Sequence, residues 1–385
     1  MNPETQKRIY LDHAATSFPK APGVPEAVQS YMTDCGASAG RGAYREAFEA
    51  KKLLDETRTS LASLFNISNS QRLIFTLNST DALNLAIKGI LKPGDHVVTS
   101  AIEHNSVSRP LLALQERHNV SFTKVKVGLD GDVDWNEFEK AIQPNTKLIA
   151  FIHGSNVSGT ITPIAQMGEK ARKQGIPLLV DAAQTAGAYP IDVEEMKIDL
   201  LAMPGHKALL GPLGTGALWV REGIELSTLK EGGTGSFSEE DRQPSFWPDI
   251  HESGSHNLLG LVGLNQACEF LKNTGIENIR RHKLELLQQI YEGLKKVNKI
   301  RMIAPEKIQN NSGVLSLQFE NKSPNEVALH LDEAYRIQGR PGLHCAPWAH
   351  ESFGTYPAGT LRFSLGFSNT SQEIEMLLQA LFAIS

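Results

Sequence analysis

The 385-residue sequence contains few cysteines and no long apolar run. Its three cysteines, Cys35, Cys268 and Cys345, are scattered, which excludes a disulfide framework and a zinc site built on closely spaced thiols. No stretch approaches the roughly 18 consecutive apolar residues that a membrane-spanning helix needs. Residues 1–10 are polar and lack the apolar core of a signal peptide. We therefore expect a cytoplasmic protein with no membrane association and no metal site.

An excess of charge of one sign is also absent. Lysine and arginine total 38 against 43 aspartate and glutamate, the formal net charge is -5, and like charges form no blocks. This balance does not favour nucleic acid or an anionic membrane as a partner. The length exceeds the comfortable size of a single core, which favours one large domain with a smaller one beside it.

Strand-like and helix-like segments alternate along much of the chain. Over well over a hundred residues, helical spacing of apolar residues separates five short apolar runs, at 72–76, 96–99, 121–127, 147–153 and 176–181. Such alternation predicts an α/β fold with a mostly parallel sheet covered by helices on both faces.

The domain organisation follows from where this alternation stops. Residues 1–24 predict an extended N-terminal arm and residues 25–257 a large domain that ends in a Gly, Ser and Pro-rich segment, 232–257. A segment of that length without periodicity is typical of a functional loop or a linker. Residues 258–385 predict a small C-terminal α+β domain, with strands near 314–319 and 360–365.

Two residues at strand ends suggest a cofactor. An apolar strand ends at Asp181, and a second apolar run ends at Lys207 in Pro204-Gly205-His206-Lys207. Ligands of doubly wound sheets bind at the carboxyl ends of the strands, so these side chains can face one flat ligand. Pyridoxal 5'-phosphate (PLP) requires an amine for its aldehyde and an anion beside its ring nitrogen. Taken singly, an aspartate there is more often a helix cap and a lysine more often a solvated loop residue.

A second feature predicts a phosphate site. Ser79 and Thr80 open an apolar helix that extends to Ile90, and a helix N-terminus binds phosphate through its free N–H groups and its dipole. An ordinary helix cap is the alternative use of these hydroxyls. The segment Gly211–Gly216 lacks the Lys-Ser/Thr ending of a phosphate loop and is interpreted as a turn.

Taken in order, these motifs resemble the PLP-dependent cysteine desulfurase and selenocysteine lyase family, in the class V aminotransferase group of fold type I enzymes. The resemblance extends from Tyr10 to about Thr370. It implies a seven-stranded, mostly parallel sheet in the large domain and an N-terminal arm that packs with the small domain. It also implies a homodimer with PLP as cofactor.

The resemblance implies these cofactor contacts. Lys207 forms the Schiff base and then moves the substrate's Cα proton, and Asp181 pairs with the pyridine nitrogen. Gln184 contacts the ring hydroxyl, and His104, in Glu103-His104-Asn105, stacks on the ring and is a catalytic residue that passes protons. The phosphate is bound by four residues: Ser79, Thr80, His206 and, from the other subunit, Ser255.

The resemblance also implies the substrate contacts. Arg362 clamps the carboxylate of L-cysteine as a two-pronged fork, which lysine could not reproduce, with a structural salt bridge as the alternative. The other implied substrate-binding residues are Asn156, Arg340 and Ala15. Cys345, in Arg340-Pro341-Gly342-Leu343-His344-Cys345, attacks the substrate sulfur and leaves L-alanine and an enzyme persulfide. A nearby His344 and Arg340 would favour its thiolate.

Pro204 departs from the family pattern, in which many members carry serine there, so one phosphate hydrogen bond is lost or supplied by another group. The alternatives are a selenocysteine or cysteine sulfinate lyase that depends less on Cys345, a class V aminotransferase, and a non-catalytic protein that retains the fold. A cysteine desulfurase would pass its sulfur to an acceptor protein, as in iron–sulfur cluster assembly.

Overall fold

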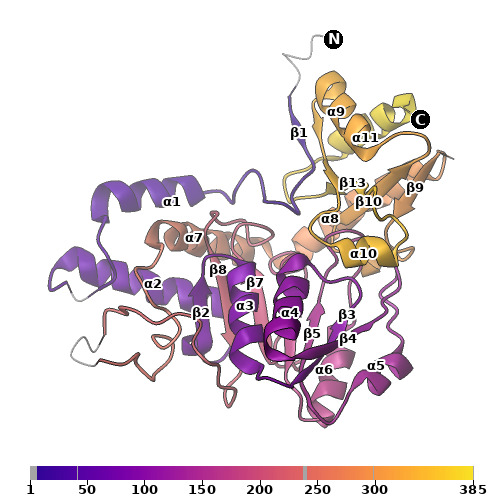
Figure 1. The fold of residues 1–385 in the computed structure, drawn as a ribbon. Helices are drawn as coiled ribbons and strands as arrows, with labels where there is room; N and C mark the ends of the chain where they lie inside the picture. The colour runs from indigo at the N-terminus through magenta and orange to yellow at the C-terminus, as the bar shows by residue number, and fades with distance from the viewer. Residues whose placement is uncertain (1–6, 41, 237–240, 298, 385) are drawn as a thin grey trace.

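The computed structural model describes residues 7–40, 42–236, 241–297 and 299–384. A seven-stranded sheet forms its centre (Figure 1). Along the sheet, the strands follow one another in the order β2 (Leu73–Thr76), β8 (Gly216–Val220), β7 (Leu200–Pro204), β6 (Leu178–Asp181), β5 (Thr146–Ile152), β3 (His96–Ser100) and β4 (Ser121–Val125). Strand β8 runs antiparallel to the other six strands, which all point the same way. The predicted α/β fold with a mostly parallel sheet is confirmed.

Helices cover both faces of this sheet because both faces of its strands are apolar. Leu178 and Val180 belong to the core on one face, whereas Leu179 between them belongs to the core on the other. Helices α3 (Ser79–Ile90) and α4 (Asn105–His118) pack on the Leu179 face. The opposite face is covered by α2 (Arg45–Ser63), α5 (Trp135–Ala141), α6 (Ile164–Lys173) and α7 (Leu258–Thr274). The short helix α1 (Val24–Ser30) continues into a π-helical turn at Tyr31–Cys35 and lies against α7.

A second, antiparallel sheet lies toward the C-terminus, with strand order β12 (Arg340–Gly342), β13 (Thr360–Ser364), β10 (Val314–Phe319) and β9 (Ile300–Ile303). Its helices are α8 (Ile276–Leu294), α9 (Pro324–Tyr335), α10 (Pro347–Ser352) and α11 (Ser371–Ile384). Helices α8, α9 and α11 share a separate apolar core with β10 and β13, to which Ile9 and Leu11 of the N-terminal segment also belong. Ala349 of α10, by contrast, belongs to the core of the large sheet. Two 3-10 turns, Ser70–Arg72 and Ile308–Asn310, complete the short elements.

The N-terminal segment lies along this second sheet region. Strand β1 (Ile9–Tyr10) pairs in parallel with β11 (Ile337–Gln338), and Figure 1 shows β1 beside the C-terminal elements. Helix α7, by contrast, packs against α1 and α2 and contributes Leu261 and Leu264 to the core of the large sheet. The boundaries at 24/25 and 257/258 stay predictions. Of the predicted arm, residues 1–6 lie outside the described residues, as do 237–240 of the predicted loop.

Within the described ranges, no helix combines the length and the apolar composition needed to cross a membrane. The same part of the chain contains no group of three or more His, Cys, Asp or Glu side chains that could hold a metal ion.

Candidate active site

The predicted cofactor residues meet at the carboxyl ends of the central strands. Asp181 is the last residue of β6, and Lys207 lies three residues after the end of β7, the strand that pairs with β6. Both line one cavity, which with its opening encloses about 430 Å³. Six other predicted site residues share this lining: Ser79, Thr80, His104, Asn156, Gln184 and His206.

Asp181 is a buried carboxylate with one oxygen engaged. Its Oδ1 accepts hydrogen bonds from the Ala183 amide at 2.9 Å and the Ser79 hydroxyl at 3.5 Å. Its Oδ2 has no hydrogen-bond partner among the described residues. Burial raises the pKa of Asp181, while the Ala183 amide and Lys207 act in the opposite direction. The free oxygen gives the cavity an acceptor for a protonated ring nitrogen.

Lys207 provides the only amine of this cavity lining. Burial lowers the pKa of Lys207 to about 8, because the charged ammonium loses water that the neutral amine needs less; Asp181 opposes this shift. Some of the amine is therefore neutral near physiological pH, the form in which it is a nucleophile.

His104 caps helix α4 and lies at the cavity edge. Its Nδ1 accepts a hydrogen bond from the Ser106 amide at 3.1 Å, so the neutral ring carries its proton on Nε2. Burial lowers the pKa of His104 to about 3, with Lys207 adding to this effect. The Ser106 hydroxyl lies 2.9 Å from His104 Nδ1 and 2.7 Å from Thr80 Oγ1, which links the starts of α3 and α4.

Helix α3 directs its N-terminus into the same cavity. Asn78 is the cap, because its side chain accepts from the Asp81 amide at 3.0 Å, and Ser79 and Thr80 are the first two helical residues. The prediction that Ser79 and Thr80 open the helix that extends to Ile90 is confirmed, whereas the alternative that they cap it is wrong. Both residues line the cavity, and their hydroxyls bond Asp181 and Ser106. The free N–H groups of this first helical turn are the donors that a phosphate requires.

The N-terminal segment closes the other side of the site. Gln184 Nε2 donates to the Ala14 carbonyl at 3.0 Å, and His206 Nδ1 lies 3.1 Å from the hydroxyl of Thr16. Ala15, predicted to contact substrate, lies in the turn between these contacts, where its amide donates to the Asp12 carbonyl at 3.1 Å.

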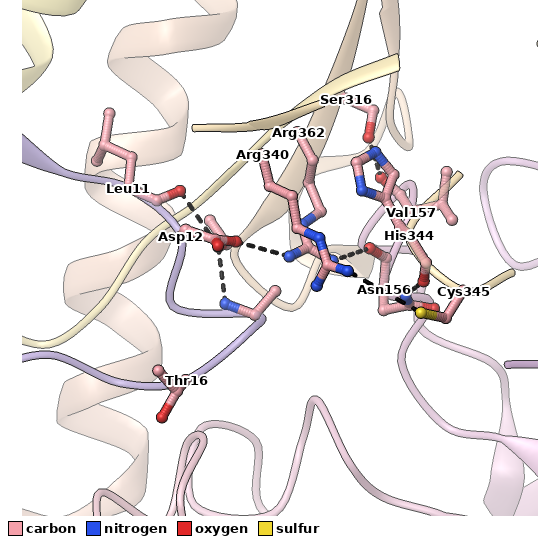
Figure 2. A network of polar contacts seen from close by, with 12 residues as sticks. Leu11, Asp12, Thr16, Asn156, Val157, Ser316, Arg340, His344, Cys345 and Arg362 are labelled. Atoms are coloured by element: carbon pink, nitrogen blue, oxygen red, sulfur yellow. Dashed lines mark hydrogen bonds and ion pairs between the residues drawn. The ribbon is translucent and has the colours of Figure 1, made fainter. Parts of the chain in front are cut away.

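Arg362 and Arg340 come from adjacent strands of the second sheet, where they are direct cross-strand partners (Figure 2). Arg362 is 1% exposed; its Nη2 pairs with Asp12 Oδ1 at 2.7 Å and its Nη1 donates to the Asn156 carbonyl at 3.1 Å. A guanidinium has five N–H donors, so Arg362 retains donors for a substrate carboxylate. Asn156 in turn donates from Nδ2 to the carbonyl of His344 at 2.7 Å. The next residue in the chain is Cys345.

Cys345 is exposed and lies beside the cavity rather than within it. Its Sγ is 3.9 Å from Arg340 Nη2, and its carbonyl accepts from the Asn105 amide at 2.8 Å, next to His104 (Figure 2). His344 and Cys345 both have positive φ angles, 50° and 57°, which is uncommon for residues with a Cβ. Two consecutive left-handed residues turn the thiol outward while the buried His344 ring bonds Thr360 Oγ1 at 3.0 Å.

Of the four predicted phosphate-binding residues, Ser255 is the one that the structure does not bring to the cavity. It is exposed and lines a different hollow together with Glu252, Lys230 and Asp81. The loop that carries it is anchored by Glu252, whose buried carboxylate pairs with Arg58 through two hydrogen bonds of 2.7 and 2.8 Å.

Comparisons with known proteins extend over the same residues. The family model for class-V aminotransferases matches residues 9–377. The chain belongs to the class-V aminotransferase family.

Three proteins similar to this chain are named for one activity. A "Probable cysteine desulfurase" of Methanothermobacter thermautotrophicus is 34% identical over 100% of this chain and 96% of its own length. The apo cysteine desulfurase of Thermococcus onnurineus NA1 superposes with a TM-score of 0.92 at 29% identity, covering 98% of this chain and 94% of that one. The Escherichia coli cysteine desulfurase CsdA has a TM-score of 0.88 at 26% identity, with 98% and 94% covered.

Three residues of the site were assigned no role from the sequence. Asp12 pairs with Arg362, and Ser106 bonds His104. Glu103 is 0% exposed, and its Oε1 accepts from the Ile152 amide at 2.9 Å and from the Ser100 hydroxyl. Burial raises the pKa of Glu103 to about 8. Glu103 could have been noticed from the sequence, because a charged residue there stands between an apolar strand and the start of a helix. Nothing in the sequence around Asp12 indicates that it pairs with Arg362.

Proposed function

We propose that this protein is a PLP-dependent cysteine desulfurase, which removes sulfur from L-cysteine to give L-alanine and a persulfide on Cys345. The observation that carries the proposal is the arrangement around one cavity: the Lys207 amine and the Asp181 carboxylate line it, and the Cys345 thiol lies at its edge beside Arg340. The names of the relatives support the same activity.

The residues of the cavity fit PLP by their chemistry. Lys207 supplies an amine of lowered pKa, Asp181 an unpartnered buried oxygen, and the start of α3 free N–H groups for a phosphate. His104 presents a neutral ring, held in place through Ser106. When bound, PLP supplies an electron sink that makes the Cα proton of an amino acid removable.

Lys207 is the group proposed to move that proton. An amine with a pKa of about 8 both accepts and releases a proton near neutral pH, as a general acid–base group should. His104 has its pKa lowered to about 3 and stays neutral, so it is suited to orienting a ring rather than carrying charge.

The substrate carboxylate is proposed to bind between Arg362 and Arg340. Both guanidinium groups lie on one face of the second sheet, and Asn156, which lines the cavity, accepts a hydrogen bond from Arg362 (Figure 2). The substrate sulfur would then point toward Cys345. The Cys345 thiolate forms a bond to that sulfur as the Cβ–S bond breaks, Cβ takes up a proton, and the products are L-alanine and the enzyme persulfide.

The exposed position of Cys345 suits the next step, because a sulfur acceptor protein must reach the persulfide from solvent. The remote and exposed Ser255 suits a homodimer, in which this hydroxyl would reach the phosphate site of the partner. Exposed apolar side chains on nearby surface elements, Met32, Tyr44 and Phe48, support such an interface. A role in iron–sulfur cluster assembly and a cytoplasmic location are part of this proposal.

Replacement of Cys345 by serine tests the reaction. We expect alanine formation from L-cysteine to fall by at least about a hundredfold, because the hydroxyl cannot accept the sulfur, while the visible absorbance of the bound cofactor is retained. Cys35→Ser is the matched control, since Cys35 is half-buried and its Sγ bonds the Glu46 carbonyl. Full activity of Cys345→Ser with L-cysteine would contradict the persulfide mechanism.

Replacement of Lys207 by alanine tests the cofactor attachment. We expect borohydride reduction of the PLP-loaded wild type to label the peptide that contains Lys207, and we expect no stable label in Lys207→Ala. Labelling of Lys20 or another lysine in the wild type would show that the assignment of Lys207 is wrong.

A further inference from the structure

A second, smaller cavity is lined by Lys207 but not by Asp181. Its volume is about 30 Å³, against about 80 Å³ for the active-site cavity measured in the same way without its opening, and this is room for one monatomic ion or about two water molecules. The N-terminal segment provides His13, helix α8 provides Lys283, and the segment after β7 provides Lys207. None of the cofactor or substrate roles proposed above uses His13 or Lys283.

Lys283 is a buried lysine without an acidic partner. The residue is 8% exposed, and its Nζ donates one hydrogen bond, to the Ser312 carbonyl at 2.6 Å. Gly313 leaves the room for its side chain, since a Cβ there would lie 2.1 Å from Lys283 Cε. No ion pair joins Lys283 to a described carboxylate, so two of its three N–H donors stay unused.

His13 supplies a second unsatisfied group in the same cavity. The residue is 7% exposed, and neither ring nitrogen makes a hydrogen bond of good geometry to a described residue, although the Tyr10 backbone and the Asn369 side chain lie near the ring. The ring is held by Tyr10, edge-on at 5.0 Å between centroids, and by Gly366, where a Cβ would lie 2.2 Å from Cε1. A buried imidazole N–H is normally hydrogen-bonded, so the fixed His13 ring can donate to a ligand in this cavity.

The charge around the cavity has one sign. Its lining contains two lysines and no aspartate or glutamate. A third lysine, Lys20, bonds Ser17 Oγ at 3.1 Å, and Ser17 also belongs to the lining. An uncompensated ammonium in a protein interior costs several kcal/mol, and an anion within hydrogen-bond reach removes that cost.

We propose that this cavity is a binding site for a small monovalent anion, such as chloride, which accepts hydrogen bonds from Lys283 and His13. The volume limits the ligand to about the size of a halide, and the paired donors select negative charge over a neutral molecule. The site stands on these contacts and does not depend on the proposed desulfurase reaction.

Crystals of the PLP-loaded enzyme soaked in sodium bromide provide the direct test, because bromide scatters anomalously. We expect an anomalous peak between Lys283 Nζ and the His13 ring in the wild type and none in Lys283→Met, which keeps the side-chain length but not the charge. Density for water molecules alone in the wild-type cavity would overturn the proposal.

Thermal unfolding provides an independent test in solution. At equal ionic strength, we expect chloride to raise the wild-type Tm by about 2 °C over gluconate, which is too large for the cavity. Lys283→Met should lose this difference, whereas Lys92→Met, which removes an exposed lysine, should keep it. The same chloride effect in Lys283→Met as in the wild type would refute the site.

Discussion

The Asp12–Arg362 ion pair joins the N-terminal segment to strand β13 across 350 positions of sequence. Asp12→Ala removes the only carboxylate that pairs with Arg362 within the described residues. The Arg362 guanidinium would keep its hydrogen bond to the Asn156 carbonyl, but Arg362 Nε has no partner among the described residues. A buried positive charge would therefore be left largely uncompensated.

The expected cost follows from the burial of the two partners. Breaking a fully buried pair costs about 3–5 kcal/mol, whereas exposed pairs contribute about 0–1 kcal/mol. The Arg362 side chain is 1% exposed but that of Asp12 is 21% exposed, so water can partly replace the lost carboxylate. We therefore expect Asp12→Ala to lower the free energy of unfolding by about 2–3 kcal/mol. Asp12→Asn keeps an acceptor and should lose about half as much.

Urea unfolding of the apoprotein measures these losses. Asp55→Ala is the matched control, because Asp55 pairs with Lys51 on the surface at 3.5 Å with side chains 51% and 63% exposed. This control should lose less than about 1 kcal/mol. A loss for Asp12→Ala no larger than that of Asp55→Ala would refute the reasoning. In activity assays the Asp12 variants should raise KM for L-cysteine, since Arg362 would no longer be held in place.

Two further predictions concern packing and pH. Gly366→Ala should destabilise the protein by about 1–3 kcal/mol in urea unfolding, because the new Cβ would overlap the His13 ring, while Gly40→Ala, with its nearest neighbour at 3.9 Å, should be nearly neutral. Glu103 has a pKa raised from 4.5 to about 8, so the folded state binds its proton more tightly than the unfolded state does. Its contribution to stability is therefore complete below pH 4.5 and is lost as pH rises toward 8; unfolding measured across this range should show a smaller decline in Glu103→Gln, and an unchanged decline would contradict the assignment.

Much of the fold could be predicted because its signals are local. A strand buried on both faces reads as a short apolar run, and the five runs up to Asp181 all correspond to strands of the large sheet. Strands β1, β9, β11 and β12 and helix α10 were missed, since two to six residues carry too little periodicity to detect. At the site, Asp181 and Lys207 could be paired from sequence because both follow strands whose carboxyl ends meet at one edge.

The amino-acid sequence by itself therefore determined the alternation of elements, the carboxylate and amine at adjacent strand ends, and the motif around Cys345. Tertiary structure alone decided that Asp12 compensates the charge of Arg362 and that the Asn105 amide bonds the Cys345 carbonyl beside His104. It also decided that His13 and Lys283 share a cavity that Lys207 lines as well. The physical reason is sequence distance. Hydrophobic periodicity and capping act between residues a few positions apart, whereas these contacts join segments that only the packing of the two sheets brings together.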